Sequence, residues 1–100
     1  MNYYVKMKLA NALVDHFGFQ KNNYVTKSQI SKRIKDIPKQ LLIDILEQYD
    51  ASTKHTVRKG IKNASDALTL LRRVLRHHER AVCYKRYNDN GKTSYKYKLL

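Results

Sequence analysis

The chain ends in two alternating segments that meet at Asn90-Gly91, and this pattern predicts a β-hairpin over residues 82–99. Asn-Gly suits a two-residue hairpin turn, because both central positions of that turn need a positive φ angle. Counting back from the turn gives three predicted pairs: Val82 with Leu99, Tyr84 with Tyr97 and Arg86 with Tyr95. We expect the face that carries these pairs to lie on the core, because strand side chains alternate between two faces. The other face then holds Cys83, Lys85, Tyr87, Ser94, Lys96 and Lys98.

The remaining segments are predicted to be helical, because their apolar residues recur at helical spacing. Helices are expected over 2–17, from a cap at Thr26 or Ser28 through Ile34, and over 38–49. Two more are expected, one from Ser52 or Thr53 for two or three turns and one over 66–79 with Ser65 as its cap. A short strand is expected at 24–26. The segment 38–49 has a strong apolar stripe, so we expect it to be the main core helix. The predicted fold class is mainly α, a helical bundle with a C-terminal two-stranded β-hairpin. The 100 residues are expected to form a single domain, with 1–50 as the helical core and 51–100 as the basic helix plus the hairpin.

Positive charge is concentrated in the second half of the chain. Residues 1–50 carry 8 Lys or Arg against 5 Asp or Glu, and residues 51–100 carry 13 against 3, so the net charges are +3 and +10. Such an asymmetric field favours association with a polyanion, although it does not bear on the fold. Nucleic acid is therefore the first candidate partner. The 14 Lys, 8 Tyr and 7 Asn also suit an AT-rich genome, such as that of a virus or phage.

Like charges lie together where stability alone favours opposite ones. Arg76 is four residues from both Arg72 and Arg80 on the predicted helix, and each such pair costs roughly 0.2–0.5 kcal/mol. Lys85 faces Lys96 across the predicted hairpin, which is also unfavourable. A phosphate backbone would neutralise this charge and release counterions. We expect the arginines and the lysine face of the hairpin to form one continuous surface; the alternative is a solvated face that confers solubility.

A basic helix followed directly by a terminal hairpin resembles the winged helix-turn-helix superfamily of DNA-binding proteins. The resemblance covers residues 53–100, and it is carried by Ser65, the Arg72-Arg73-x-x-Arg76 face and the Asn88-Asp89-Asn90-Gly91 tip. In that superfamily the helix before the wing usually enters the major groove. The wing lies on the backbone or in an adjacent groove.

The resemblance implies which residues contact DNA. In this reading Thr69, Arg72, Arg73 and Arg76 face the groove, Lys85, Arg86, Lys92 and Lys96 hold phosphates, Arg58, Lys59 and Lys62 make flanking backbone contacts, and Arg80 and Lys98 extend the same surface. Thr69 either contacts a base edge or lies in solvent. Tyr87, on the outer face near the tip, is either an ordinary strand residue or a contact for an unpaired base or a phosphate. Tyr84 and Tyr97 are expected to pack on their neighbours.

A second possible helix-turn-helix, over residues 28–49, is rejected as the reading element. Its reading helix would run from Lys39 to Tyr49, and the exposed side of that helix carries Asp44, Glu47 and Asp50. DNA would repel these acids. They form either an ordinary solvated face or part of a contact with another protein.

The sequence carries no recognisable motif for catalysis, metal binding or cofactor binding. Cys83 is the only cysteine, which excludes a zinc motif, and the adjacent His77 and His78 point about 100° apart on a helix. No Gly-rich phosphate loop is present. We therefore expect no enzyme activity, no metal and no cofactor. No apolar run approaches about 18 residues, so no membrane span is expected, and a single cysteine suits a reducing cytoplasm.

Together these observations predict a sequence-specific or architectural protein that binds double-stranded DNA, used as a transcriptional regulator. A homodimer on a two-fold site is considered, because DNA-binding proteins are commonly dimers. Two alternatives stay open. One is an RNA-binding module, since basic helices and Tyr-bearing strands also suit RNA. The other is a small adaptor or inhibitor that binds an acidic surface of a host enzyme.

Overall fold

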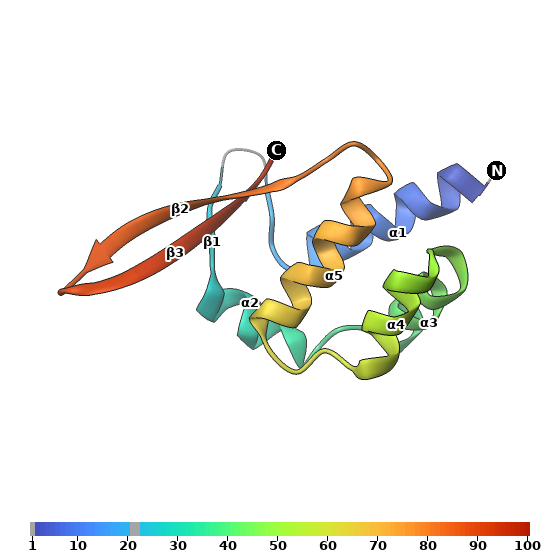
Figure 1. Cartoon of the computed structure of the whole chain (residues 1–100), viewed down its shortest axis with the longest axis horizontal. Helices are drawn as coiled ribbons and strands as arrows, with labels where there is room; N and C mark the ends of the chain where they lie inside the picture. The colour runs from blue at the N-terminus through green and yellow to red at the C-terminus, as the bar shows by residue number, and fades with distance from the viewer. Residues whose placement is uncertain (1, 21–22) are drawn as a thin grey trace.

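In the described residues, five helices form the body of the protein, and a β-hairpin extends from one side of it (Figure 1). The computed structural model describes residues 2–20 and 23–100. The helices are α1 (Asn2–His16), α2 (Lys27–Ile34), α3 (Lys39–Gln48), α4 (Ala51–Lys59) and α5 (Ala64–Arg76), and the strands are β1 (Val25–Thr26), β2 (Val82–Asp89) and β3 (Lys92–Leu99). The hairpin makes the molecule elongated, with extents of 47 × 25 × 20 Å. The structure is therefore mainly helical, with a small antiparallel sheet formed at its C-terminal end.

The hairpin has the predicted register. Val82 lies opposite Leu99, Tyr84 opposite Tyr97 and Arg86 opposite Tyr95. Asn90 and Gly91 have φ angles of 50° and 82°, as the tight turn requires. The short strand expected at 24–26 is β1, which pairs Val25 with Tyr97 and gives the sheet the order β1-β3-β2. Because α2 follows β1 directly, this third strand ties the hairpin to the start of α2.

The main core helix is α5, and the prediction that residues 38–49 would take this place is wrong. In α3 only Leu41 and Ile45 are buried. Buried residues of α5 are Ala64, Ala67, Leu68, Leu70, Leu71, Val74 and Leu75. The physical reason is the position of each helix. Helix α5 packs against α1, α2 and α4, whereas the extensive contacts of α3 are with α1 and α4. A strong apolar stripe says that a helix has a buried face but not how many neighbours surround it.

Local caps set the ends of the helices near the basic surface. Asn63, not Ser65, caps α5, because its side-chain oxygen accepts from the backbone N–H of Asp66 at 2.9 Å. At the other end α5 stops at Arg76, three residues before the predicted limit. Glu79 has a φ of 52°, and the N–H of the next residue, Arg80, returns to the carbonyl of Leu75 at 3.1 Å. The chain therefore turns away from the helix axis before Arg80.

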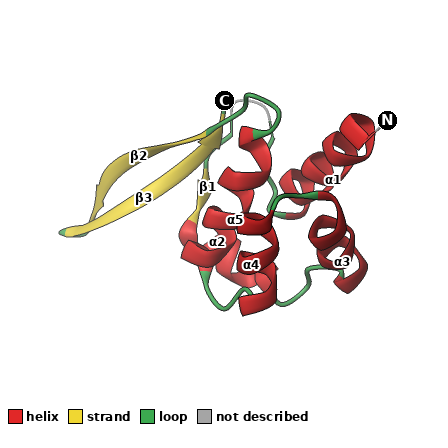
Figure 2. Ribbon diagram, turned by 45° about the vertical axis from the view of Figure 1, so that its right-hand side comes forward, coloured by secondary structure: helices red, strands yellow, loops and turns green. Residues whose placement is uncertain are grey.

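The hairpin contacts the core only at its base, so the expectation that one whole face lies on the core is wrong. Tyr97 is 7% exposed, but Tyr84 is 64% exposed and Tyr95 is 39% exposed. Strands of eight residues span about 27 Å, and Figure 2 shows them reaching well beyond the helices. The outer part of the face therefore has no helix beneath it.

His78 joins the end of α5 to α1 and α3. The Tyr49 hydroxyl donates to the carbonyl of Lys6 and lies 3.2 Å from Nε2 of His78. Since this hydroxyl has one proton, His78 donates from Nε2, which leaves the buried Nδ1 unprotonated and without a partner among the described residues. Burial disfavours the charged imidazolium and lowers the pKa of His78 below its ordinary value.

We expect the free energy of unfolding to fall as the pH is lowered from 7.5 to 5.5. In this window the unfolded chain takes up a proton at His78 near its ordinary pKa, while the folded protein resists protonation, so acid favours unfolding. Urea denaturation at both pH values measures the loss. The variant His78→Leu should show a smaller loss, because the other titrating groups are unchanged. Equal losses in the two proteins would contradict this role.

Candidate nucleic-acid interface

A single stripe of α5 faces solvent. Ser65, Thr69, Arg72 and Arg76 are exposed, and their spacing places them in one row along the helix. The Thr69 hydroxyl donates to the Ser65 carbonyl at 2.9 Å, so it remains available as an acceptor. Within residues 2–20 and 23–100, neither the Arg72 nor the Arg76 guanidinium makes a hydrogen bond or an ion pair. Both retain all their donors for an external acceptor.

Arg73 lies at the edge of this stripe and links two helices. Its Nη1 donates to the Ser52 carbonyl at 2.7 Å and to the Thr56 hydroxyl at 2.8 Å. These bonds hold α4 against α5. Arg73 therefore stabilises the packing of the two helices, and only its remaining N–H groups are available to bind a ligand.

Arg80 lies elsewhere, and the prediction that it shares the face of the other arginines is wrong. Its Nη1 donates to Asn11 Oδ1 on α1 at 3.1 Å, beside Asp15. The early end of α5 and the turn at Glu79 account for this position.

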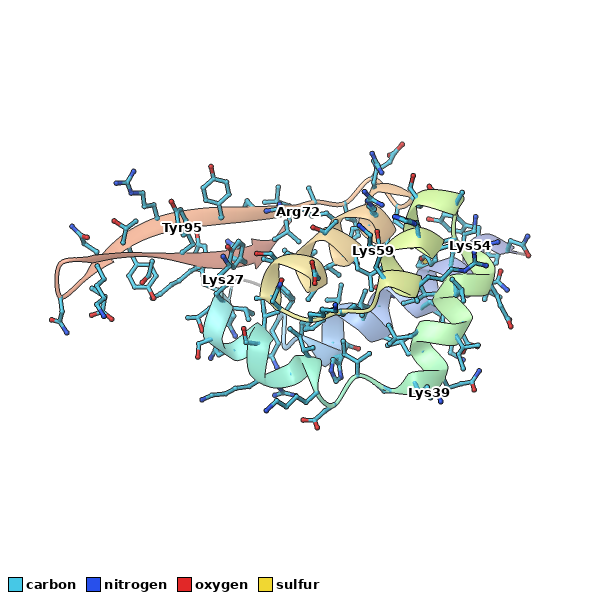
Figure 3. The ribbon with its side chains drawn as sticks, turned by 60° about the horizontal axis from the view of Figure 1, so that its bottom comes forward. Lys27, Lys39, Lys54, Lys59, Arg72 and Tyr95 are labelled. Atoms are coloured by element: carbon cyan, nitrogen blue, oxygen red, sulfur yellow. The ribbon has the colours of Figure 1, made fainter. Side chains whose placement is uncertain are left out.

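The exposed row of α5 is the centre of a concave surface that continues onto α4, α2 and the hairpin. Three hollows join through shared residues: Thr69 and Arg73 line the first two, and Arg72 lines the second and the third. We call this surface the α5 strip, and it consists of Lys27, Ser52, His55, Thr56, Lys59, Gly60, Lys62, Asp66, Thr69, Arg72, Arg73, Arg76, Tyr84, Tyr95 and Tyr97. Figure 3 labels four positions along it: Lys59, Arg72, Lys27 and Tyr95. Six of its residues are Lys or Arg and one is acidic, so the strip is strongly cationic.

The arginines and the hairpin lysines do not form one continuous surface, which corrects the sequence-based expectation. The hairpin face that carries Tyr84 and Tyr95 turns toward Arg72. Since side chains alternate along a strand, the opposite face carries the lysines predicted to hold phosphates, Lys85, Lys92 and Lys96, together with Lys98. Of the basic hairpin residues named in the prediction, Arg86 alone lies on the side of α5.

On the lysine face, the ammonium groups pack over tyrosine rings. Lys96 Nζ lies 4.6 Å from the ring centroid of Tyr87, and Lys98 Nζ lies 5.7 Å from that of Tyr24. Cation–π pairs of this kind are worth about 0.5–1 kcal/mol at exposed sites. The ring of Tyr87, a candidate for stacking on a base, is therefore already covered on one side by a protein group.

The chain matches no family model, no curated protein and no solved structure. Its geometry and its electrostatics therefore carry the functional argument.

The predicted flanking residues divide into two groups. Lys59 and Lys62 line the α5 strip beside α4. Arg58 is exposed but lies outside the hollows of the strip. The structure adds Lys27, Tyr84 and Tyr95, which sequence reasoning did not place on a binding surface. The predicted register did put Tyr84 and Tyr95 on one face, but it did not show that they are exposed.

Protein carboxylates do not neutralise the basic side chains. In the described part of the chain the only side-chain ion pair is His77 Nε2 with Asp50 Oδ2, at 3.1 Å. The backbone N–H of Thr53 donates to Asp50 Oδ1 at 2.9 Å, and this bond, aided by His77, holds the pKa of Asp50 below its ordinary value. Asp50 is thus a charged cap for α4, and the lysines and arginines remain open to an external anion.

Residues 2–20 and 23–100 contain neither a cluster of metal-ligating side chains nor a helix suited to cross a membrane. No group of three or more His, Cys, Asp or Glu side chains lies close enough to hold a metal ion. None of the helices described there has the length and apolar character needed to cross a lipid bilayer.

Proposed function

We propose that this protein binds double-stranded DNA across the α5 strip, in the manner of a winged helix, as a transcriptional regulator or an architectural protein. Arg72 and Arg76 reach into the major groove. Lys59 and Lys62 on one side, and Arg86 on the other, contact the flanking phosphates. The order of a basic helix followed by a hairpin supports the winged-helix comparison.

One observation carries this proposal: two adjacent arginines on the exposed row of α5 have no protein partner in the described residues. The row runs along a helix of 13 residues, about 20 Å long, and the major groove of B-form DNA is about 12 Å wide. Arginine donates two parallel bonds to guanine O6 and N7 or to phosphate oxygens. A row of this kind costs stability through like-charge repulsion, and a polyanion removes that cost.

The geometry favours B-form DNA over duplex RNA. Side chains on a helix enter the wide major groove of DNA, but the major groove of A-form RNA is deep and too narrow to read. We therefore expect duplex DNA to displace a labelled duplex at a concentration at least about tenfold lower than duplex RNA of the same sequence. Competition titrations with duplex DNA, duplex RNA and each single strand measure this preference.

The outcome of that competition separates the proposal from its alternatives. Stronger competition by duplex RNA would replace the proposal with an RNA-binding role. Failure of every nucleic acid to bind would leave the adaptor role, in which an acidic protein surface occupies the strip. Selection from random duplexes at two salt concentrations then divides the DNA-binding roles, because a regulator enriches a consensus and an architectural protein does not.

A further inference from the structure

Two tyrosine rings stand in solvent at the junction of the hairpin and α5. Tyr84 and Tyr95 lie on the same face of the hairpin, with ring centroids 5.7 Å apart and planes inclined by 70°. Tyr84 is 64% exposed, so most of its surface contributes nothing to the core. An edge-to-face pair of this kind presents the open face of one ring, held in place by its neighbour.

Cations border this aromatic pair. Lys27, at the start of α2, and Arg72, on α5, line the same hollow as Tyr84, Tyr95 and Tyr97, and no acidic residue lines it. Figure 3 shows Lys27 and Arg72 near the base of the hairpin, with Tyr95 farther out along it. Arg86, the cross-strand partner of Tyr95, lies on the same hairpin face. The hollow therefore combines a flat aromatic surface with positive charge on its borders.

The tyrosines of the opposite face are arranged differently. There, Tyr87 and Tyr24 each have a lysine ammonium over the ring, at 4.6 Å and 5.7 Å from the ring centroids. A ring that carries a protein cation has one face less for a ligand. Tyr84 and Tyr95 make no such contact with a cation among the described residues. Their rings are therefore the ones on the hairpin that a base can stack on.

The chemistry of the hollow matches one nucleotide of a single strand. An aromatic ring stacks on a base of any sequence, and nearby cations attract its phosphate. A base inside a duplex has no free face, so only an unpaired nucleotide can use the rings. Arg72 belongs to both this hollow and the centre of the α5 strip, so a strand that leaves a duplex bound on α5 passes directly to the tyrosines.

We propose that Tyr84 and Tyr95 bind an unpaired nucleotide of DNA that continues from the duplex on the α5 strip. This inference rests on the proposed function and makes it more specific. The preferred substrate is a duplex that ends in, or adjoins, a single-stranded segment. Lys27 holds the phosphate next to the stacked base, while Arg72 remains in the groove of the adjoining duplex.

The test compares a blunt DNA duplex with the same duplex carrying a short single-stranded thymidine extension. We expect the protein to bind the extended duplex about 5- to 150-fold more tightly, which is the range that one stacked base supplies. The double variant Tyr84→Leu/Tyr95→Leu should lose this preference and bind the blunt and the extended duplex with affinities within about twofold of each other. The matched control Tyr24→Leu/Tyr87→Leu removes two rings from the other face and should keep the preference.

A second readout reports stacking itself. With 2-aminopurine as the first unpaired base, binding should quench its fluorescence, and Tyr84→Phe/Tyr95→Phe should preserve the quenching while Tyr84→Leu/Tyr95→Leu abolishes it. Equal binding of the two duplexes by the unchanged protein, or a preference that survives in the Leu double variant, would overturn the inference and leave the proposed function intact. Binding of neither duplex would overturn both.

Discussion

Raising the salt concentration from 50 to 200 mM is expected to weaken the binding of duplex DNA by about 10³- to 10⁴-fold. The expectation comes from the number of phosphates that the protein neutralises. The α5 strip carries six Lys or Arg residues, and Arg86 lies on the hairpin face that turns toward it. About six to eight phosphate contacts give a slope of log K against log salt of about −5 to −7, because each contact releases a condensed counterion.

Fluorescence anisotropy of a labelled duplex, titrated at a series of salt concentrations, measures this slope. The Leu double variant at the hairpin tyrosines is the control, because it changes no charge and should keep the same slope on a blunt duplex. A slope near zero would mean that duplex binding, if present, does not involve the basic residues. That result would contradict the proposal that the basic residues neutralise DNA phosphates.

The hairpin could be predicted from the sequence in detail because its signals are local. Asn90-Gly91 specifies the turn, the turn specifies the register, and the observed pairs agree with the count from the sequence. The strand at 24–26 was also predictable from its residues. Its pairing with β3 was not, because Val25 and Tyr97 meet only after the whole chain has folded.

The choice of the central helix could not be predicted, because it depends on packing between distant segments. Residues 38–49 and α5 both have an apolar stripe, and α5 has more neighbours. The consequence for the site is direct. A central helix has little exposed surface, so its open positions reduce to one row, from Ser65 to Arg76.

The basic surface was predictable in its location on α5 but not in its shape. Arg72 and Arg76 were correctly placed on the exposed side of the helix. Arg80 was misplaced because a helix that ends three residues early redirects the chain. The partners of Arg73 on α4 are tertiary contacts with no sequence signal. The sequence correctly predicted which hairpin positions carry the lysine face, but it does not say which face of the hairpin turns toward α5.

Replacing both Arg72 and Arg76 with Gln is expected to weaken duplex binding at least about 30-fold. Each arginine that reads a base or a phosphate contributes about 1–3 kcal/mol, and a combined loss of about 2 kcal/mol corresponds to that factor. Stability should change little or increase slightly, because neither side chain bonds to the described residues and their mutual repulsion disappears. Thermal unfolding of the variant checks this point.

The matched control is Arg33→Gln/Lys39→Gln, which removes the same net charge from exposed positions outside the α5 strip. Figure 3 shows Lys39 at the far edge of the molecule from Arg72. Titration of one labelled duplex with the unchanged protein and with both double variants at a single salt concentration is the most direct test of the α5 strip as the binding surface. If the α5 strip binds the duplex, we expect the affinity to fall at least about 30-fold for Arg72→Gln/Arg76→Gln and to change less than about threefold for the control. Equal losses in the two variants would show that duplex DNA responds only to total charge, and would contradict a binding surface on α5.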